Sequence, residues 1–386
     1  MPLDLHYGGA VSGSQKFDRP ELEARFVELF AGGAGIKMFG LRRIGKSTLR
    51  LHLHRALEQQ GRKVAFIDGQ GLQSLSAFLS RLSMETSEAG GLWHRMIDAV
   101  AAEPVRKALG AIDSGEKLEA AAFSAYWQHV STAIRKALSE GARPVLIVDE
   151  FSYLIQNMVE GNGVADVDRL LGSMREWREA GMQMLLTGSI GVTQLARRKG
   201  LNLEHLNDLQ PFAIPELTEE EARHFIAGAT SRSEGAWTDG HTEAFLRECS
   251  VLYPCFLVKG LQEVGTKGPA APERFADIFA DRVRPHLHAD FYEQFSKRFG
   301  LYGELGRGER DGLILPALKA IMTAADPVEQ ADLPVGEPFT RVDLDVALGM
   351  LVEDGFVHFR EDRDGNRLWK PGSQLARLWW KRARLA

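Results

Sequence analysis

The chain has 386 residues, more than one simple core accommodates, so about two or three domains are expected. Hydrophobic residues make up 44% and charged residues 26%, which excludes a disordered or fibrous chain. Because 47 basic and 52 acidic side chains give a net charge of -5, no global field draws the chain to nucleic acid or to an anionic membrane. Such binding would have to be local.

The N-terminal residues and the two cysteines bear on where the protein is located. Residues 1–6 lack a basic segment followed by an apolar run, and no stretch approaches the length of a membrane span. We expect a cytoplasmic protein without membrane contact. The spacing of Cys249 and Cys255 fits neither a zinc pair nor a redox pair, so both are expected to be buried thiols.

The first half of the chain alternates short apolar runs with segments of helical period. This alternation is typical of a parallel sheet whose strands are joined by crossover helices. The predicted strands are Ile36 to Phe39, Val64 to Ile67, Val145 to Val148 and Met182 to Leu186. The predicted helical faces are Leu75, Phe78, Leu79 and Leu82, then Phe123, Trp127, Val130 and Ile134, then Val167, Leu170, Leu171, Met174 and Trp177. The sequence therefore predicts an α/β domain over residues 1–215.

The pattern changes after Pro215, where a small helical lid is predicted over residues 216–284. Thr218 and Glu221 form a capping box, and Pro254 begins a second helix. Residues 285–386 form the third predicted domain. Two helices, around 315–321 and 344–351, precede a hairpin of residues 356–360 and 367–370 and a basic amphipathic helix over 374–384, which suggests a winged helix.

A phosphate-binding loop is predicted at residues 40–47, whose sequence GLRRIGKS fits the pattern G-x-x-x-x-G-K-[ST] between a strand and a helix. Gly40 and Gly45 would let backbone N–H groups close around phosphates, and the helix dipole would add to them. Lys46 should reach the β and γ phosphates, and the Ser47 hydroxyl should bind magnesium. The alternative is a glycine turn that caps a helix without binding a ligand.

A second motif ends the strand that begins at Val145. Asp149 follows a buried run and could hold magnesium, while the adjacent Glu150 could polarise water. A magnesium site needs only the aspartate, so the glutamate favours hydrolysis over passive binding. The alternative is a solvated turn after a strand.

Polar residues also follow the next predicted strand. Thr187 and Ser189 could lie beside the γ phosphate, or they could simply cap the following helix. The basic run of residues 197–199 could supply a transition-state cation, or it could be a solvated surface.

These residues together resemble the bacterial and archaeal P-loop ATPases of the STAND and AAA+-like (archaeal ATPase) group. The resemblance rests on residues 17–22, on the loop arginines Arg42 and Arg43, and on the sequences of residues 149–151, 187–189, 207–209 and 215–217. It implies an adenine contact near Arg19, a γ-phosphate sensor at Thr187 or Ser189, a helical lid and a winged helix. We include Arg42, Arg43 and Thr48 among the nucleotide-binding residues.

The C-terminal region has a divided charge pattern that bears on DNA. The predicted recognition helix carries four acidic residues and only Arg341 as a base between positions 340 and 354, which disfavours docking in the major groove. From residue 360 onward eight basic residues stand against three acidic ones, with Trp369, Trp379 and Trp380 between them. This segment could grip or stack on nucleic acid, or its tryptophans could pack on the domain.

The sequence therefore predicts magnesium-dependent binding and hydrolysis of ATP, driving a conformational switch that reaches a C-terminal winged helix. Two alternatives remain. One is a DNA-associated ATPase, resembling initiators, helicase loaders or regulators of mobile elements, that uses the basic tail. The other is a protein-interaction scaffold that binds ATP but hardly turns it over. A protein partner, self-association and the identity of an arginine finger stay open.

Overall fold

The computed structural model describes residues 2–33, 35–75, 77–78, 81–82, 131–132, 134–136, 138–139, 144–304 and 313–383. They form two compact units, each described by itself. The sheet unit comprises Pro20–Phe39 and Arg50–Phe212, and the helical unit comprises Met1–Arg19, Gly40–Leu49 and Ala213–Ala386. The predicted helical positions 123, 127 and 130, and position 79, lie outside the described residues.

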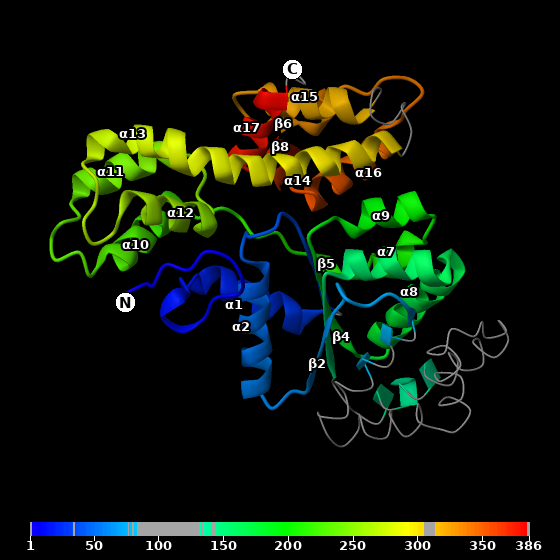
Figure 1. Ribbon diagram of the computed structural model, residues 1–386. Helices are drawn as coiled ribbons and strands as arrows, with labels where there is room; N and C mark the ends of the chain where they lie inside the picture. Colours follow the sequence, from blue (N-terminus) through cyan, green and yellow to red (C-terminus); the bar gives the residue numbers. More distant parts are fainter. Residues whose placement is uncertain are drawn as a thin grey trace. The chain divides into compact units, whose positions relative to one another are not determined.

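The sheet unit contains five parallel strands in the order β2-β3-β4-β1-β5 (Figure 1). The four predicted strands are confirmed to within two residues at each end. The runs at 145–148 and 184–186 are buried on both faces, whereas the edge strand at 64–68 alternates between buried and less buried residues. The fifth is too short to give a periodic signal. The strands are β1 (Gly35–Phe39), β2 (Val64–Asp68), β3 (Val145–Asp149), β4 (Gln183–Gly188) and β5 (Gln210–Pro211).

Helices flank this sheet and complete its core. The predicted apolar face of α8 is confirmed, because all five of its residues are buried, and Trp177 donates its indole N–H to Ser131 Oγ at 3.2 Å. The described helices are α1 (Pro20–Gly32), α7 (Phe151–Asn162), α8 (Val164–Glu179) and α9 (Val192–Lys199). Helix α2 (Lys46–Gln59) begins in the helical unit's segment and continues into the sheet unit.

The register of the parallel strands brings their carboxyl ends to one edge of the sheet. Asp68 lies opposite Asp149, and Phe39 lies opposite Gly188. Position 188 is tightly packed, because an added Cβ would lie 3.0 Å from both the Phe39 ring and Ser152 Oγ and would force one of them to shift. The polar residues that follow β3 and β4 are therefore neighbours.

The part of the helical unit that follows β5 starts with the predicted lid helices. The Thr218–Glu221 capping box is confirmed at the start of α10, and Pro254 is the first residue of α12. A π-turn, η4 (Phe279–Val283), joins α13 to the long helix α14. The bounds are α10 (Glu219–Thr230), α11 (Asp239–Glu248), α12 (Pro254–Val264), α13 (Phe275–Ile278) and α14 (Arg284–Glu304).

The C-terminal part of this unit contains helices and a small antiparallel sheet of order β6-β8-β7. The predicted helices and hairpin are confirmed, whereas β6 was not predicted because it has only two residues. The elements are α15 (Leu315–Thr323), β6 (Val328–Glu329), α16 (Arg341–Glu353), β7 (Val357–Glu361), β8 (Arg367–Pro371) and α17 (Gln374–Ala383).

The C-terminal tryptophans correct one of the sequence-based alternatives. Trp369, Trp379 and Trp380 are all at most 2% exposed, so they do not present rings on which bases could stack. An amphipathic helix packs its apolar face against its own domain, and α17 buries Trp379 and Trp380 in this way. The interpretation of a packed final helix is the correct one.

Both cysteines are buried and reduced, as expected, and burial raises the pKa of Cys249 and of Cys255 to about 12. Among the helices that the structure describes, none has the length and apolar character needed to cross a membrane. The division into three domains at residues 215 and 284 stays a prediction, as does the cytoplasmic location.

Candidate functional site

The phosphate loop is a tight turn with three residues in positive-φ backbone. Gly40, Arg43 and Gly45 all adopt positive φ, at 152°, 66° and 108°. Apart from Gly45 itself and its two chain neighbours, no heavy atom lies within 4 Å of the position that a Cβ on Gly45 would occupy. The Leu49 amide donates to the Gly45 carbonyl at 3.0 Å and begins the first turn of α2. The loop thus leads directly into a helix N-terminus, where anions bind favourably.

Lys46 is only 8% exposed and lies over the loop's own backbone. Its Nζ donates to the Gly40 carbonyl at 2.9 Å and to the Leu41 carbonyl at 2.6 Å. Thr48 Oγ1 accepts a hydrogen bond from the Val11 amide at 3.4 Å, which ties the N-terminal segment to the start of α2. The Lys46 ammonium group is therefore hydrogen-bonded to backbone carbonyls of its own loop in this structure.

The two loop arginines contact α14. The Arg42 amide donates to Gln294 Oε1 at 2.8 Å. The guanidinium of Arg43 donates to Asp290 Oδ2 at 2.5 Å and to the Tyr7 hydroxyl at 2.8 Å, and it lies 5.2 Å from the centre of the Tyr7 ring. We call the contacts of Arg42 and Arg43 with Asp290 and Gln294 the α14 latch.

Arg19 contacts the start of the lid. Its guanidinium donates to both carboxylate oxygens of Glu221, at 3.0 and 3.3 Å, and to the carbonyls of Pro215 and Glu216, at 3.0 and 3.3 Å. Burial raises the pKa of Glu221, but hydrogen bonds from Arg19 and the Thr218 amide outweigh this effect, so the pKa is lower than its ordinary value. In this structure Arg19 anchors the N-terminal segment to α10, and its predicted adenine contact stays a prediction.

The sheet unit contributes a second group, the strand-end cluster, formed by Arg50, Asp149, Glu150, Thr187 and Ser189. Asp149 Oδ1 accepts from the Thr187 hydroxyl and, at 3.0 Å, from the Glu150 amide. Arg50 Nε lies 3.3 Å from Asp149 Oδ2 as an ion pair without hydrogen-bond alignment, and its guanidinium lies over the Phe66 ring. The carboxylate of Asp149 is thereby oriented from two sides.

Glu150 is held in an uncommon backbone conformation, with φ at 49°. Left-handed backbone is unfavourable for residues other than glycine and concentrates at functional sites. Its Oε2 accepts from the Ser189 hydroxyl at 3.1 Å and from the Ser189 amide at 3.3 Å. The structure thus brings each carboxylate of the predicted pair together with one of the two predicted sensor residues.

Other candidate residues lie elsewhere. Lys199 pairs with Glu160 at 3.6 Å, and the side chain of Arg198 is not described. Among the described residues no three His, Cys, Asp or Glu side chains gather as a protein-only metal site. A magnesium ion shared with phosphate oxygens does not need such a cluster, because it keeps one or two protein ligands.

Sequence reasoning missed Arg50, Asp290 and Gln294. Arg50 could have been found, because it lies four residues after Lys46 and so on the same face of α2. Asp290 and Gln294 carry no signal of this kind, since they come from a helix about 250 residues further along the chain, with sequence separations of 247 and 252.

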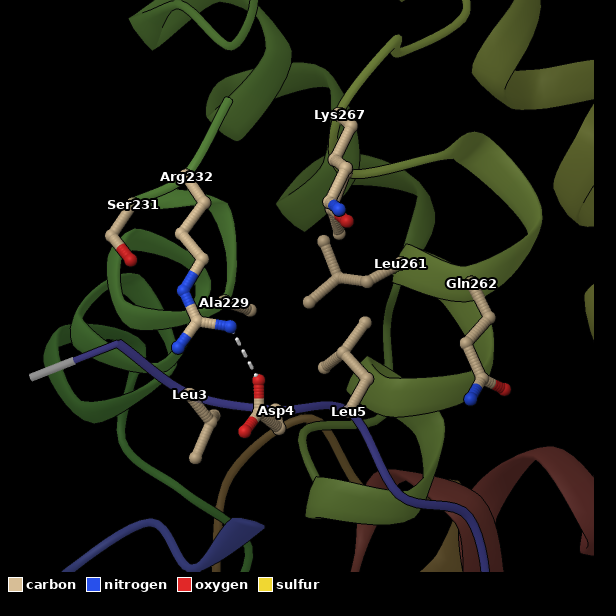
Figure 2. Close-up of a pocket in the computed structure, with 10 residues that line it drawn as sticks. Leu3, Asp4, Leu5, Ala229, Ser231, Arg232, Leu261, Gln262 and Lys267 are labelled. Atoms are coloured by element: carbon tan, nitrogen blue, oxygen red, sulfur yellow. Dashed lines mark hydrogen bonds and ion pairs between the residues drawn. The ribbon is translucent and has the colours of Figure 1, made fainter. Parts of the chain in front are cut away.

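A separate pocket of about 290 Å³ lies in the helical unit and contains none of the predicted site residues. Leu3, Leu5 and Leu261 form its apolar part (Figure 2). Arg232 and Lys267 lie at its sides, and Arg232 is paired with Asp4 at 2.8 Å. Asp4 thus neutralises one of the two cations at this pocket.

Comparison with known proteins agrees with this arrangement. Residues 32–195 match the family model described as an AAA domain, which is less than half of the chain. Over 98% of this chain and 99% of the other, the structure superposes on a Walker-type ATPase of Pyrococcus abyssi with a TM-score of 0.53 and 14% identity. This chain has a P-loop NTPase fold.

Two further structures superpose on this P-loop fold more loosely. They are the ORC2 protein of Aeropyrum pernix, at 12% identity, a TM-score of 0.42 and coverages of 98% and 96%, and domain III of the DnaA initiation protein of Thermotoga maritima, at 12% identity, a TM-score of 0.40 and coverages of 70% and 95%. No curated protein matches the sequence. The fold and the AAA-type match support nucleotide binding.

Proposed function

We propose that this protein is a magnesium-dependent ATPase. The observation that carries the proposal is the strand-end cluster, in which Glu150 stands beside Asp149 and is hydrogen-bonded to Ser189. A protein that only bound nucleotide would need the phosphate loop and one metal ligand. A second carboxylate, strained in its backbone and held by a neighbouring strand end, fits a role in positioning water for hydrolysis.

The phosphate loop would bind the nucleotide. Gly40 and Gly45 make the backbone turn that cradles phosphates, and Lys46 would exchange its bonds to the loop carbonyls for bonds to phosphate oxygens. Thr48 follows Ser47 in the first turn of α2 and supports the N-terminal segment. Arg42 and Arg43 add positive charge at the mouth of the loop, and Arg19 stays the predicted contact of the base.

Ser47 and Asp149 would hold magnesium. The fit rests on chemistry that the structure contains: Asp149 is an oriented carboxylate at the end of a buried strand, and hard cations prefer such oxygens. When bound, the ion neutralises charge on the phosphates. Thr187 keeps the Asp149 carboxylate in one orientation, and Ser189 keeps Glu150 from turning away.

We further propose that the C-terminal part of the helical unit is a winged helix that receives the switch. The order α15, β6, α16, β7, β8 and the sheet order β6-β8-β7 support this classification. Its helix α16 is acidic on its exposed surface, with Asp343 and Asp345, so a protein partner fits this helix better than the major groove does.

The test is ATP turnover by the wild type, Lys46→Ala and Glu150→Gln, together with binding of a fluorescent ATP analogue. We expect Lys46→Ala to abolish binding and Glu150→Gln to bind normally but to lose turnover by about a hundredfold or more. Unchanged turnover in Glu150→Gln would favour the scaffold that binds ATP without using it.

A DNA-associated ATPase is the second candidate, and one observation favours it. Arg360, Arg363 and Lys370 are exposed or on the hairpin turn, where they could contact phosphates. Because α17 is packed into the domain, its deletion would disturb the fold, and charge changes are the better test. Duplex-stimulated turnover that falls on replacing these three residues by Gln, with a normal melting temperature, would establish this function.

A further inference from the structure

We propose that the α14 latch restrains the phosphate loop and transmits its release on nucleotide binding to the C-terminal helices. This inference rests on the proposed nucleotide binding. It makes Asp290 and Gln294 positioning residues that act through Arg43 and Arg42.

The contacts of the latch come from one face of α14. Asp290 and Gln294 are four residues apart, which places them one above the other on a helix. Asp290 pairs with the Arg43 guanidinium at 2.5 Å, and Gln294 accepts from the Arg42 amide at 2.8 Å. Both contacts reach the exposed segment of the loop rather than its buried end.

Another face of the same helix is packed into the C-terminal part. The Phe295 ring stacks on Trp379 at 5.6 Å and lies 5.2 Å from Phe356. Trp379 donates its indole N–H to Ser296 Oγ at 3.0 Å. The Tyr302 hydroxyl donates to Asp354 at 2.8 Å, at the end of α16. A shift of α14 must therefore move these contacts or break them.

Figure 1 shows α14 as one long continuous helix. Its 21 residues connect the turn of the latch with the turns that carry Ser296 and Tyr302. A helix transmits displacement along its axis because its backbone hydrogen bonds are internal. The latch and the C-terminal core are thus attached to a single rigid element.

Electrostatics sets the direction of the effect. Asp290 is an anion at a loop that must receive anionic phosphates, and it occupies the guanidinium that could pair with them. Phosphate and Asp290 therefore compete for Arg43, and an ion pair that must break for Arg43 to reach phosphate weakens nucleotide binding by linkage. Removing the charge of Asp290 should tighten binding.

The experiment measures the dissociation constant of ADP for wild type, Asp290→Asn and the control Glu293→Gln. Glu293 lies on the same helix and pairs with Lys297 of that helix at 2.6 Å, so its change removes equal charge without touching the latch. We expect Asp290→Asn to bind ADP about two- to fivefold more tightly, the range of an exposed ion pair, and Glu293→Gln to bind like wild type.

Two readouts separate coupling from a merely structural role. In an Arg43→Gln background Asp290→Asn should change ADP affinity no further, because its effect acts through that guanidinium. In wild type, ADP should accelerate amide exchange in α17, and Asp290→Asn without ADP should already exchange at the faster rate.

Equal ADP affinities for wild type and Asp290→Asn, or exchange in α17 that ignores bound ADP, would overturn the latch and leave the proposed function standing. If wild type itself bound no ADP, the proposed function would fail and the latch with it. An equally large gain in Glu293→Gln would reduce the effect to general charge and would also overturn the latch.

Discussion

The phosphate loop and the strand-end cluster are both candidate parts of the site, but their residues find partners in different ways. In the cluster Asp149 pairs with Thr187, and Glu150 pairs with Ser189, over separations of 38 and 39 residues. The loop arginines pair with α14 over separations of 247 and 252 residues. The first kind of contact was predictable and the second was not.

Sheet geometry explains the difference. Parallel strands end at one edge, so residues that follow β3 and β4 are neighbours whatever the connection between them does. The contacts of the loop arginines with α14 are not set by the sheet. The loop backbone is specified locally by glycine, while Arg42 and Arg43 contact the helix that the tertiary fold brings to them. A substitution that disturbs the sheet should therefore affect the strand-end cluster, and a substitution that strains the loop backbone should affect the phosphate loop.

The largest expected effect is on the stability of the sheet unit. Arg178, whose side chain is 0% exposed, makes two 2.7 Å bonds to Asp208 and one to the His205 carbonyl, and so anchors the chain before β5. We expect Asp208→Asn to lower the free energy of unfolding by about 3 kcal/mol, because it leaves a buried guanidinium unpaired. Urea unfolding measures this loss, with Glu179→Gln in an exposed pair of α8 as a near-neutral control.

The same pair predicts a pH dependence. Burial raises the pKa of Asp208, but hydrogen bonding and the charge of Arg178 outweigh it, so this pKa is lower than in the unfolded chain. The stabilisation is therefore present above the unfolded pKa, near 4, and is lost as the pH falls through the folded value. The stability difference between wild type and Asp208→Asn should shrink between about pH 5 and pH 3; a constant difference would contradict this assignment.

The next effect concerns the loop backbone. Gly45 has φ at 108° with open space where a side chain would stand, so Gly45→Ala adds backbone strain and no collision. We expect the free loop of the variant to relax out of this conformation, so that returning to it on binding costs about 1–3 kcal/mol and weakens ATP binding by about five- to hundredfold. Gly71→Ala, equally open and without positive φ, is the control. Equal affinities of the two variants would show that binding does not require residue 45 to return to a strained conformation.

Thr187→Val tests the cluster without disturbing its packing. Valine keeps the shape but removes the hydroxyl that orients Asp149, so we expect turnover to fall by about tenfold, as for a lost hydrogen bond to a charged group. Thr187→Ser restores the hydroxyl and should recover most of the rate. If serine fails as valine does, restoring the hydroxyl is not sufficient, and the hydrogen bond to Asp149 alone does not explain the loss.

The smallest expected effect is at Arg50. Its cation lies 3.3 Å from the carboxylate that would bind magnesium, so it competes with the metal ion. Arg50→Met keeps the apolar contact with Phe66 and should lower the magnesium concentration for half-maximal turnover by about two- to fivefold. A higher magnesium requirement would mean that Arg50 orients Asp149 for the metal and does not oppose it.

Much of the sheet unit and of the site was determined by the sequence itself. Short apolar runs predicted β1 to β4, most clearly for β3 and β4, because a strand covered on both faces is apolar along most of its length. The loop pattern at residues 40–47 and the carboxylate pair at 149–150 were visible because each is contiguous. The glycine positions were readable too, since only glycine tolerates positive φ without strain.

Tertiary structure alone decided the rest. β5 and β6 have two residues each, too few for any period, and exist because a neighbouring strand is there to pair with them. Whether the C-terminal tryptophans stack on a ligand or on the domain depends on burial, which composition does not encode. The partners of Arg42 and Arg43 depend on where α14 lies, and long-range packing that has no local repeat leaves no trace in the sequence.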